Sequence, residues 1–209
     1  MTGRSRAAHF GAASLGTGVP VPARKLIVSE NMTLDGVIDL ADDWFTPPGV
    51  DGSGDTTDLE ETLRGHMAMQ DALLLGRRTF EAFRAHWPKQ TDDTTGITAH
   101  LNQVKKYVVS SSLDDPQWAN TIVLRGDLVD EVRTLKESEG AEIAVGGSIS
   151  VVWKLIAAGL VDEYRIFVHP VVLGHGRRLF EGNAPRPKLE LVESKSFRAG
   201  VVLMTYRVG

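Results

Sequence analysis

The chain has no cysteine among its 209 residues, which excludes disulfide bonds, a thiol nucleophile and thiolate metal ligands. Its six histidines include no His-x-x-x-His pair, so we expect no zinc site. No apolar run approaches the roughly 20 residues that span a bilayer. The formal net charge is -4, and the sequence has no long basic block of the kind that marks a nucleic-acid-binding protein. We therefore expect a cytoplasmic protein with neither a membrane anchor nor a nucleic-acid partner.

The remaining composition is that of an ordinary globular protein, with 42% hydrophobic and 24% charged residues. The length suits one domain with a sizeable core. Residues 1–23 are rich in Gly, Ala, Ser and Pro and lack periodicity, so we interpret them as a flexible leader. The alternative is that this leader packs on a partner subunit. Residues 24–209 would form the domain.

Apolar runs typical of strands alternate with helical patterns until the last third of the chain, which is rich in strands. This order predicts one α/β domain with a mostly parallel central sheet and a C-terminal antiparallel hairpin. The expected strands cover residues 24–30, 72–75, 106–110, 121–124, 142–145, 161–169, 188–197 and 201–208. The expected helices cover residues 58–70, 98–104, 128–135 and 151–158, and one more begins near residue 77.

Three expected strands end in small or phosphate-compatible residues: 76–79 (GRRT), 110–112 (SSS) and 146–148 (GGS). Ligands of open α/β sheets bind at the carboxyl ends of strands, and free N–H groups at a helix start favour an anion. Arg77 and Arg78 at a helix start oppose the helix dipole, and a bound anion would offset this. The alternatives are that the glycines form a simple turn and that the arginines are solvated. We favour a dinucleotide site, although no G-x-G-x-x-G or Walker sequence is present.

The long segment between the first strand and the first helix, from Asn31 to residue 57, is typical of a functional loop. Trp44 is a large apolar group in this polar loop and should cover something. Asp35 precedes a glycine and is the best candidate for a polar group that faces the substrate, although Asp-Gly is also a common turn. Asn31, Asp35 and Trp44 are therefore candidate substrate-binding residues. The segment 174–178 (GHGRR) is interpreted as a structural loop, with the alternative that it borders the substrate, and His169 is not nominated for a role.

Several motifs in order along residues 24–208 resemble the dihydrofolate reductase-like superfamily. They are Asp35-Gly36, 71–80 (DALLLGRRTF), 108–111 (VVSS), 145–148 (VGGS), 159–163 (GLVDE) and 170–176 (PVVLGHG). The branch that this chain resembles most is the C-terminal reductase domain of the bifunctional riboflavin-biosynthesis deaminase/reductase, with its stand-alone relatives.

The resemblance implies a dihydrofolate reductase-like three-layer fold and an NADPH-dependent oxidoreductase, usually a homodimer, that reduces a pyrimidine or pterin-like substrate. In the riboflavin enzymes the substrate resembles 5-amino-6-(5-phosphoribosylamino)uracil. Asp35 matches the acidic residue near the substrate and is the candidate catalytic residue. The residues that would bind the cofactor by this carry-over are Gly76, Arg77, Arg78, Thr79, Ser110, Ser111, Gly146, Gly147, Ser148 and Ile149.

The resemblance also implies a cis peptide bond between Gly146 and Gly147, as in dihydrofolate reductases. The chain departs from the riboflavin reductases at Thr33, where they have serine, and it has no zinc motif of a deaminase. The cofactor inference is therefore firmer than the substrate inference. Two alternatives remain open: dihydrofolate reduction, and a nucleotide-binding module without reductase chemistry.

Overall fold

The computed structural model describes residues 23–50, 54–181 and 187–209, so the expected leader lies, except for residue 23, outside the described residues. The strands are β1 (Leu26–Thr33), β2 (Gln70–Gly76), β3 (Lys105–Val109), β4 (Thr121–Leu124), β5 (Glu142–Val145), β6 (Glu163–His169), β7 (Leu189–Ser196) and β8 (Val202–Val208). The helices are α1 (Thr57–Met69), α2 (Arg77–His86), α3 (Ile97–Gln103), α4 (Leu128–Glu137) and α5 (Ile149–Ala157), with short 3-10 helices η1 (Ala41–Asp43) and η2 (Trp87–Lys89).

The strands form one sheet in the order β4-β3-β2-β5-β1-β6-β8-β7. The strands from β4 to β6 in this order pair in parallel, whereas β8 runs antiparallel to both β6 and β7. The predicted mostly parallel sheet with a C-terminal antiparallel hairpin is therefore confirmed. The observed elements differ from the predicted bounds by a few residues, and the two short 3-10 helices were not predicted.

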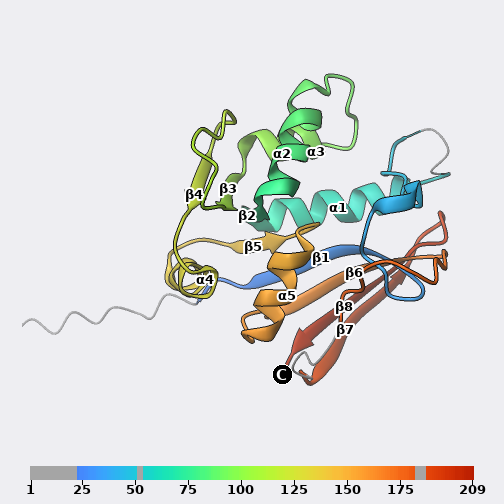
Figure 1. The fold of residues 1–209 in the computed structure, drawn as a ribbon. Helices are drawn as coiled ribbons and strands as arrows, with labels where there is room; N and C mark the ends of the chain where they lie inside the picture. Colours follow the sequence, from blue (N-terminus) through green and yellow to red (C-terminus); the bar gives the residue numbers. More distant parts are fainter. Residues whose placement is uncertain (1–22, 51–53, 182–186) are drawn as a thin grey trace, which may run out of the picture.

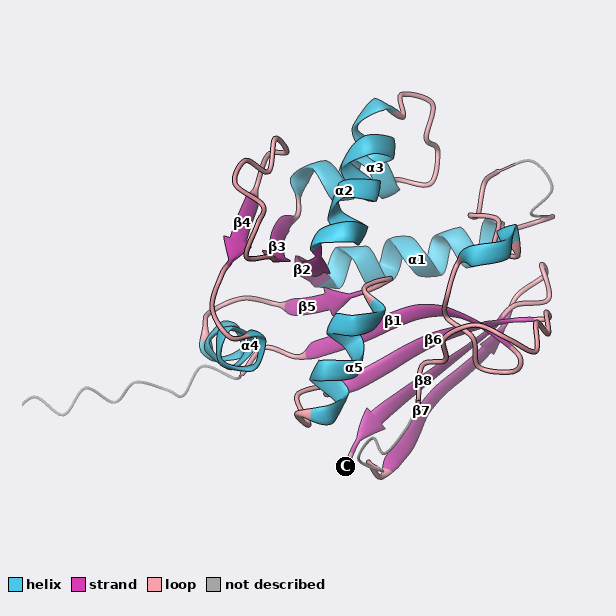
Figure 2. Cartoon of the chain, viewed as in Figure 1, coloured by secondary structure: helices cyan, strands magenta, loops and turns pink. Residues whose placement is uncertain are grey.

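Helices cover both faces of the sheet, which gives the predicted three layers (Figures 1 and 2). Leu74 of β2 and Val145 of β5 pack in the same cluster as residues of α4 and α5. Leu73, the neighbour of Leu74, packs instead with residues of α2 and α3. On that second face, Leu59 of α1 packs against Phe167 of β6. Successive strand residues point to opposite faces, so a continuous apolar run such as that of β2 serves both layers.

The chain leaves two neighbouring parallel strands toward opposite faces of the sheet. From β1 it continues to α1 on one face, and from β5 it continues to α5 on the other. The ladder between these strands ends at Val28 and Val145, where the chain turns from β5 into α5 while β1 continues to Thr33. This is the topological switch point, where open α/β sheets hold their ligands.

The peptide bond between Gly146 and Gly147 is trans, as are all peptide bonds in the described parts of the chain. The expectation of a cis bond is therefore wrong. The chain turns from β5 into α5 through a left-handed residue instead, since Gly147 has a φ of 67°, which glycine adopts without a side-chain clash. A Cβ atom on Gly146 would lie 3.0 Å from the carbonyl oxygen of Ser29, so the two strands approach closely here.

Candidate active site

A cavity of about 940 Å³ opens at the switch point. Its wall includes Ser29, Glu30 and Asn31 at the end of β1 and the segment 146–151 that follows β5. The start of α2 contributes residues 76–79. Further residues of the wall come from α1, α3, β6 and the loop after β1, and single residues come from other elements, among them Val109 of β3, Lys154 of α5 and Arg177. The volume lies at the upper end of the range for small-molecule sites, so the cavity is large enough for an extended ligand.

Two of the three predicted strand-end turns meet directly. The N–H of Gly76 donates to Oγ of Ser148 at 2.8 Å, and Oγ1 of Thr79 donates to the carbonyl oxygen of Gly147 at 3.3 Å. These bonds join the start of α2 to the start of α5. Gly76, Arg77, Arg78, Thr79, Gly146, Gly147, Ser148 and Ile149 all line the cavity.

Arg77 and Arg78 bring positive charge to this wall. Both side chains are exposed, and Arg77 pairs with Glu81 one turn later at 3.2 Å. Arg78 forms no hydrogen bond or ion pair with the residues that the structure describes, so its guanidinium group is available to a ligand. An anion at the start of α2 would interact with this group and with the free backbone N–H groups of the first turn.

The third predicted turn does not reach the cavity. Val109 lines the wall, but Ser110 and Ser111 do not. The hydroxyl oxygen of Ser110 accepts hydrogen bonds from the N–H groups of Ser112 and Leu113 and so stabilises the loop after β3. The contribution of these serines to cofactor binding stays a prediction.

Glu30 is a buried carboxyl group in the cavity wall that the sequence reasoning missed. Its side chain is 5% exposed, and its Oε1 accepts the N–H of Gly147 at 2.8 Å. Burial raises the pKa of Glu30 to about 8, although the bond from Gly147 opposes this effect. The group therefore holds a proton near neutral pH. The sequence feature that could have revealed Glu30 is its position as an acidic residue two positions after the apolar run 26–28 of an expected strand, because an acidic residue in such a strand is often a buried polar group.

Asp35 lies outside the cavity wall. Its carboxylate accepts hydrogen bonds from the Thr33 hydroxyl at 2.7 Å and from the N–H groups of Leu173 and Gly174 at 3.2 and 2.9 Å. The bond from Thr33, with that from Gly174, lowers the pKa of Asp35 to about 2. This carboxylate joins the turn after β1 to the loop after β6, and its catalytic role stays a prediction that the geometry does not favour.

Asn31 and Trp44, the two other candidate substrate-binding residues, both contact His169. Asn31 lines the cavity, and its Oδ1 lies 3.0 Å from Nε2 of His169, which also lines it. Trp44 lies behind this wall, with its ring edge-on to Phe45 and His169 at centroid distances of 5.9 and 5.5 Å. Burial lowers the pKa of His169, so its imidazole is neutral at physiological pH. Trp44 thus supports the wall, as expected of a covering residue.

The loop 174–178 also reaches the cavity, through Arg177. The Nε of Arg177 donates to Oδ2 of Asp39 at 2.6 Å, and both residues line the wall. Arg178 continues the contact, since it pairs with Val37 in an isolated bridge. The sequence left two interpretations of this segment open, a structural loop and a border of the substrate site, and the position of Arg177 favours the second. No local pattern could reveal this, because Asp39 lies 138 residues away.

The described parts of the chain contain no group of three or more His, Cys, Asp or Glu side chains placed to bind a metal ion. None of their helices combines the length and hydropathy of a bilayer-spanning segment.

Known proteins are similar to this chain in sequence or in fold. The family model of the RibD C-terminal domain matches residues 24–203. The Bacillus subtilis (strain 168) protein YyaP, which is uncharacterised, is 31% identical over 187 residues, covering 88% of this chain and 94% of YyaP. Among solved structures, a putative riboflavin biosynthesis protein from Shewanella sp. PV-4 has a TM-score of 0.62 at 20% identity and covers 88% of this chain and 99% of its own.

A third match is the Thermotoga maritima diaminohydroxyphosphoribosylaminopyrimidine deaminase/5-amino-6-(5-phosphoribosylamino)uracil reductase. It has a TM-score of 0.61 at 16% identity, and the match covers 90% of this chain and 57% of the Thermotoga chain. The fold shared with these two structures is the dihydrofolate reductase-like fold. On the match over residues 24–203, this chain belongs to the RibD C-terminal domain family.

Proposed function

We propose that this protein is an NADPH-dependent reductase of a flat heterocyclic compound. One observation carries the proposal: a single cavity at the topological switch point joins a cationic helix start to the buried carboxyl group of Glu30. Membership in a family of reductase domains supports the same chemistry. The riboflavin-pathway reductases supply the model for the substrate, a pyrimidine or a related ring.

The residues of the cationic wall fit a phosphorylated dinucleotide. Arg78 would bind a phosphate group, and Thr79 would add a hydroxyl donor. The paired glycines 146 and 147 leave no side chain between the wall and a bound pyrophosphate, and the start of α5 directs its free N–H groups to the same space. NADPH, when bound, supplies a hydride for the reduction.

The protein's own contribution would be orientation, exclusion of water and a proton. Reduction of a C=N or C=O bond by hydride leaves a nitrogen or oxygen atom that must be protonated. The buried carboxyl of Glu30 holds a proton near neutral pH and lines the cavity beside Gly147. We therefore assign Glu30 as the candidate general acid, since an acid of pKa near the working pH transfers protons most effectively.

Steady-state NADPH oxidation tests the proposal. The assay compares 5-amino-6-ribosylaminouracil, with and without its 5-phosphate, with dihydrofolate and with no second substrate. Oxidation that depends on either pyrimidine supports the proposal. Oxidation only with dihydrofolate would assign the folate activity instead. Tight NADPH binding, measured by calorimetry, with no oxidation in any arm would favour a nucleotide-binding module without reductase chemistry.

We also propose a homodimer, for which the edge strand β7 is a suitable surface. All eight residues of β7 are exposed, and they include Leu191 and Val192, with 53% and 47% of their surface exposed. An exposed apolar edge strand is usually covered or paired, and a second copy of the chain would cover it. Light scattering after size-exclusion chromatography tests this proposal, and a monomer at micromolar concentration would contradict it.

A further inference from the structure

Asn31 of β1 and His169 at the end of β6 form a polar pair in the cavity wall. Oδ1 of Asn31 lies 3.0 Å from Nε2 of His169, and both residues are half-buried. The strand register pairs Asn31 with Phe167 and Thr33 with His169, so all four side chains lie on one face of the sheet. Phe167 packs with Leu59 of α1. The pair therefore belongs to the α1 side of the cavity.

The contact between the two side chains determines which ring nitrogen of His169 carries the proton. A carbonyl oxygen can only accept a hydrogen bond, so Nε2 of His169 is the donor to Oδ1 of Asn31. Burial lowers the pKa of His169, so the imidazole is neutral at physiological pH. In a neutral imidazole with its proton on Nε2, the other nitrogen, Nδ1, holds a lone pair. His169 thus offers an acceptor at Nδ1, and Asn31 offers a donor at Nδ2.

These two groups have no partner within the described parts of the chain. Nδ1 of His169 and Nδ2 of Asn31 form no hydrogen bond with a described residue, and the buried unpaired side-chain atoms lie on other residues, so both atoms are accessible. The other wall residues from α1 and β6 are Leu59, Leu63 and Phe167, which have no hydrogen-bonding side chain. A ligand that displaces water from this part of the cavity must therefore satisfy the pair itself, because an unpaired buried polar group costs free energy.

Aromatic rings hold the imidazole of His169 in one orientation. Trp44 and Phe45 lie edge-on to it, each at a centroid distance of 5.5 Å. Nε1 of Trp44 donates to the carbonyl oxygen of Asp39 at 2.7 Å, which fixes the indole in turn. The acceptor nitrogen is therefore held in place by packing and does not depend on a ligand for its position.

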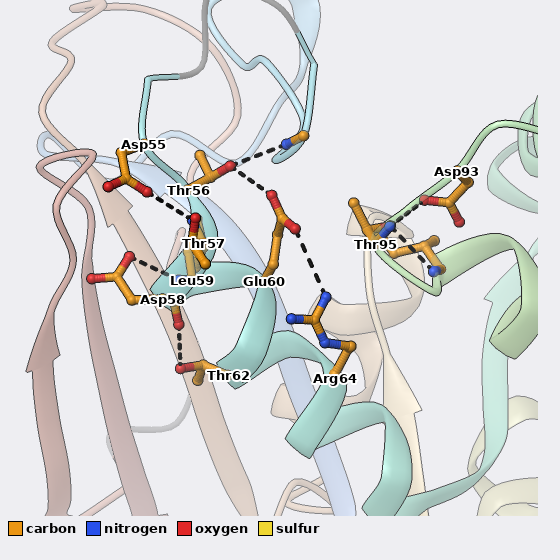
Figure 3. A network of polar contacts seen from close by, with 12 residues as sticks. Asp55, Thr56, Thr57, Asp58, Leu59, Glu60, Thr62, Arg64, Asp93 and Thr95 are labelled. Atoms are coloured by element: carbon orange, nitrogen blue, oxygen red, sulfur yellow. Dashed lines mark hydrogen bonds and ion pairs between the residues drawn. The ribbon is translucent and has the colours of Figure 1, made fainter.

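The loop that carries these rings is anchored to the start of α1 by polar contacts (Figure 3). The hydroxyl group of Thr56 donates to Glu60 at 2.8 Å and accepts the N–H of Gly49 at 3.2 Å. Gly49 belongs to the same loop, so these bonds restrict the movement of the loop relative to the cavity. A wall that is ordered before binding loses little conformational entropy when a ligand enters.

We propose that Asn31 and His169 together bind a lactam group of the substrate. The ring N–H of the lactam donates to Nδ1 of His169, and its carbonyl oxygen accepts from Nδ2 of Asn31. A lactam is uncharged and presents these two groups side by side, which matches a pair that carries no formal charge. A ring whose nitrogen is alkylated leaves Nδ1 without a partner, so the pair determines specificity. This inference rests on the proposed reductase function and narrows its flat heterocyclic substrate to a cyclic amide.

Two fluorescent pteridines test the pair directly. Lumazine carries two ring N–H groups, each next to a carbonyl group, and 1,3-dimethyllumazine has the same rings and carbonyl groups with both nitrogens methylated. Fluorescence titrations with and without NADP⁺ make the outcome independent of cofactor binding. We expect lumazine to bind at least about tenfold more tightly, since the dimethyl form leaves a buried acceptor unpaired. Equal affinities, or no lumazine binding at millimolar concentration, would overturn the inference.

Variants of His169 separate a lost hydrogen bond from a steric effect of the methyl groups. His169→Phe keeps an aromatic ring beside Trp44 but removes the acceptor, so the preference for lumazine should fall below about threefold. His169→Asn places an amide oxygen near the position of Nδ1 and should retain part of the preference. His86→Phe makes the same change at the exposed end of α2, outside the cavity, and should keep the full preference. A full preference in a His169→Phe variant that is folded by circular dichroism would show that the methyl groups clash elsewhere and overturn the inference.

Asn31→Leu tests the donor of the pair. Both probes keep their carbonyl groups, so the loss of Nδ2 should weaken both of them at least about threefold and leave the affinity for NADPH unchanged. Unchanged probe affinities in the folded variant would contradict the proposal. Weaker NADPH binding with unchanged probes, in variants of Asn31 and His169 alike, would show that the pair binds the carboxamide of the nicotinamide and would also overturn it.

Turnover separates this inference from the proposed function. Pyrimidine-dependent NADPH oxidation without a preference for lumazine would overturn the inference and leave the reductase function standing. A preference for lumazine that disappears in His169→Phe, with no NADPH oxidation on any substrate, would retain the lactam site and reject the reductase function.

Discussion

Oε1 of Glu30 accepts the N–H of Gly147 at 2.8 Å, although the two residues are 117 positions apart in the chain. The bond joins β1 to the turn between β5 and α5, across the gap where pairing between β1 and β5 has ended. It places a buried carboxyl group next to the glycine that the sequence indicates for cofactor binding. Its protonation state therefore affects both the stability and the chemistry of the site.

Glu30→Gln should remove a pH-dependent loss of stability. The pKa of Glu30 is about 8 in the folded protein and near 4.5 when the chain unfolds. Between these values the folded protein holds a proton that the unfolded chain has released. The free energy of unfolding therefore falls as the pH rises through this window, by up to about 1.4 kcal/mol per pH unit. Urea denaturation from pH 5 to 8 measures the difference, with Glu137→Gln at the exposed end of α4 as control. Parallel curves for wild type and Glu30→Gln would contradict the buried-acid assignment.

Glu30→Gln should also lower kcat at least tenfold and change the Kd of NADPH less than threefold, because the amide keeps the shape of the side chain but cannot supply the proton. In the wild type, kcat should fall as the pH rises above about 8, where the carboxyl group loses its proton. The variant should lack this decline. Stopped-flow absorbance of NADPH across pH 6 to 9 measures both effects. A Glu30→Gln variant with the kcat of the wild type would contradict the assignment of Glu30 as the general acid.

Arg78→Ala should weaken NADPH more than NADH. The guanidinium group of Arg78 is exposed at the start of α2 and lines the cavity, so it is placed to bind a phosphate. We expect a loss of about tenfold to a hundredfold in NADPH affinity, as for one charge-assisted hydrogen-bonded contact. Calorimetry with both cofactors measures it. Arg133→Ala on α4, outside the cavity, is the matched control, and equal losses for NADPH and NADH would argue against contact with the extra phosphate.

Ser148→Ala should destabilise the protein by about 1 to 2 kcal/mol, because the N–H of Gly76 loses its acceptor in a partly buried position. The same change loosens the junction between the starts of α2 and α5, so NADPH affinity should fall as well. Chemical denaturation and calorimetry measure the two effects, with Thr94→Val, which removes an exposed hydroxyl group in the loop before α3, as control. A variant as stable as the wild type would show that another group satisfies Gly76.

Asp35→Asn should lower the melting temperature at pH 7, since the amide is a weaker acceptor for Thr33, Leu173 and Gly174. The pKa of Asp35 is about 2 in the folded protein and near 3.8 unfolded. The wild type therefore loses this stabilisation as the pH falls from about 4 to 2, and the two melting curves should converge there. Turnover at a temperature where both proteins are folded tests the catalytic assignment. A large loss of kcat would support that assignment, whereas normal kcat would leave Asp35 a structural role.

The glycine turns that line the cavity were predictable because their pattern is local. Gly76 and Gly146 each follow an apolar run and precede a helical pattern, which predicts that they lie at the carboxyl end of a strand. Parallel strands bring such ends together at one edge of the sheet. Ser110 follows the same pattern but does not reach the cavity, because its hydroxyl serves the backbone of the next loop residues. The pattern shows where a strand ends and not which way its last side chain points.

The substrate side depends on pairs of residues that are distant in the chain. The Asp-Gly turn made Asp35 a candidate site residue, yet its partners Leu173 and Gly174 lie in the loop after β6 and hold it outside the cavity. Glu30 is inconspicuous in the sequence. The register of β1 against β6 determines the face of the sheet on which the Glu30 side chain lies, and this position brings it into contact with the cavity.

The sequence by itself determined the order of strands and helices, the parallel sheet with its final hairpin, and the cationic start of α2, because periodicity and turn residues act over a few positions. Tertiary structure alone decided that the bond between Gly146 and Gly147 is trans, that Glu30 is buried with a raised pKa, and that Glu30 and the two glycines line one cavity. Burial and register are properties of assembled elements, so the electrostatics and shape of the site arise only when β1, β5 and α1 are packed together.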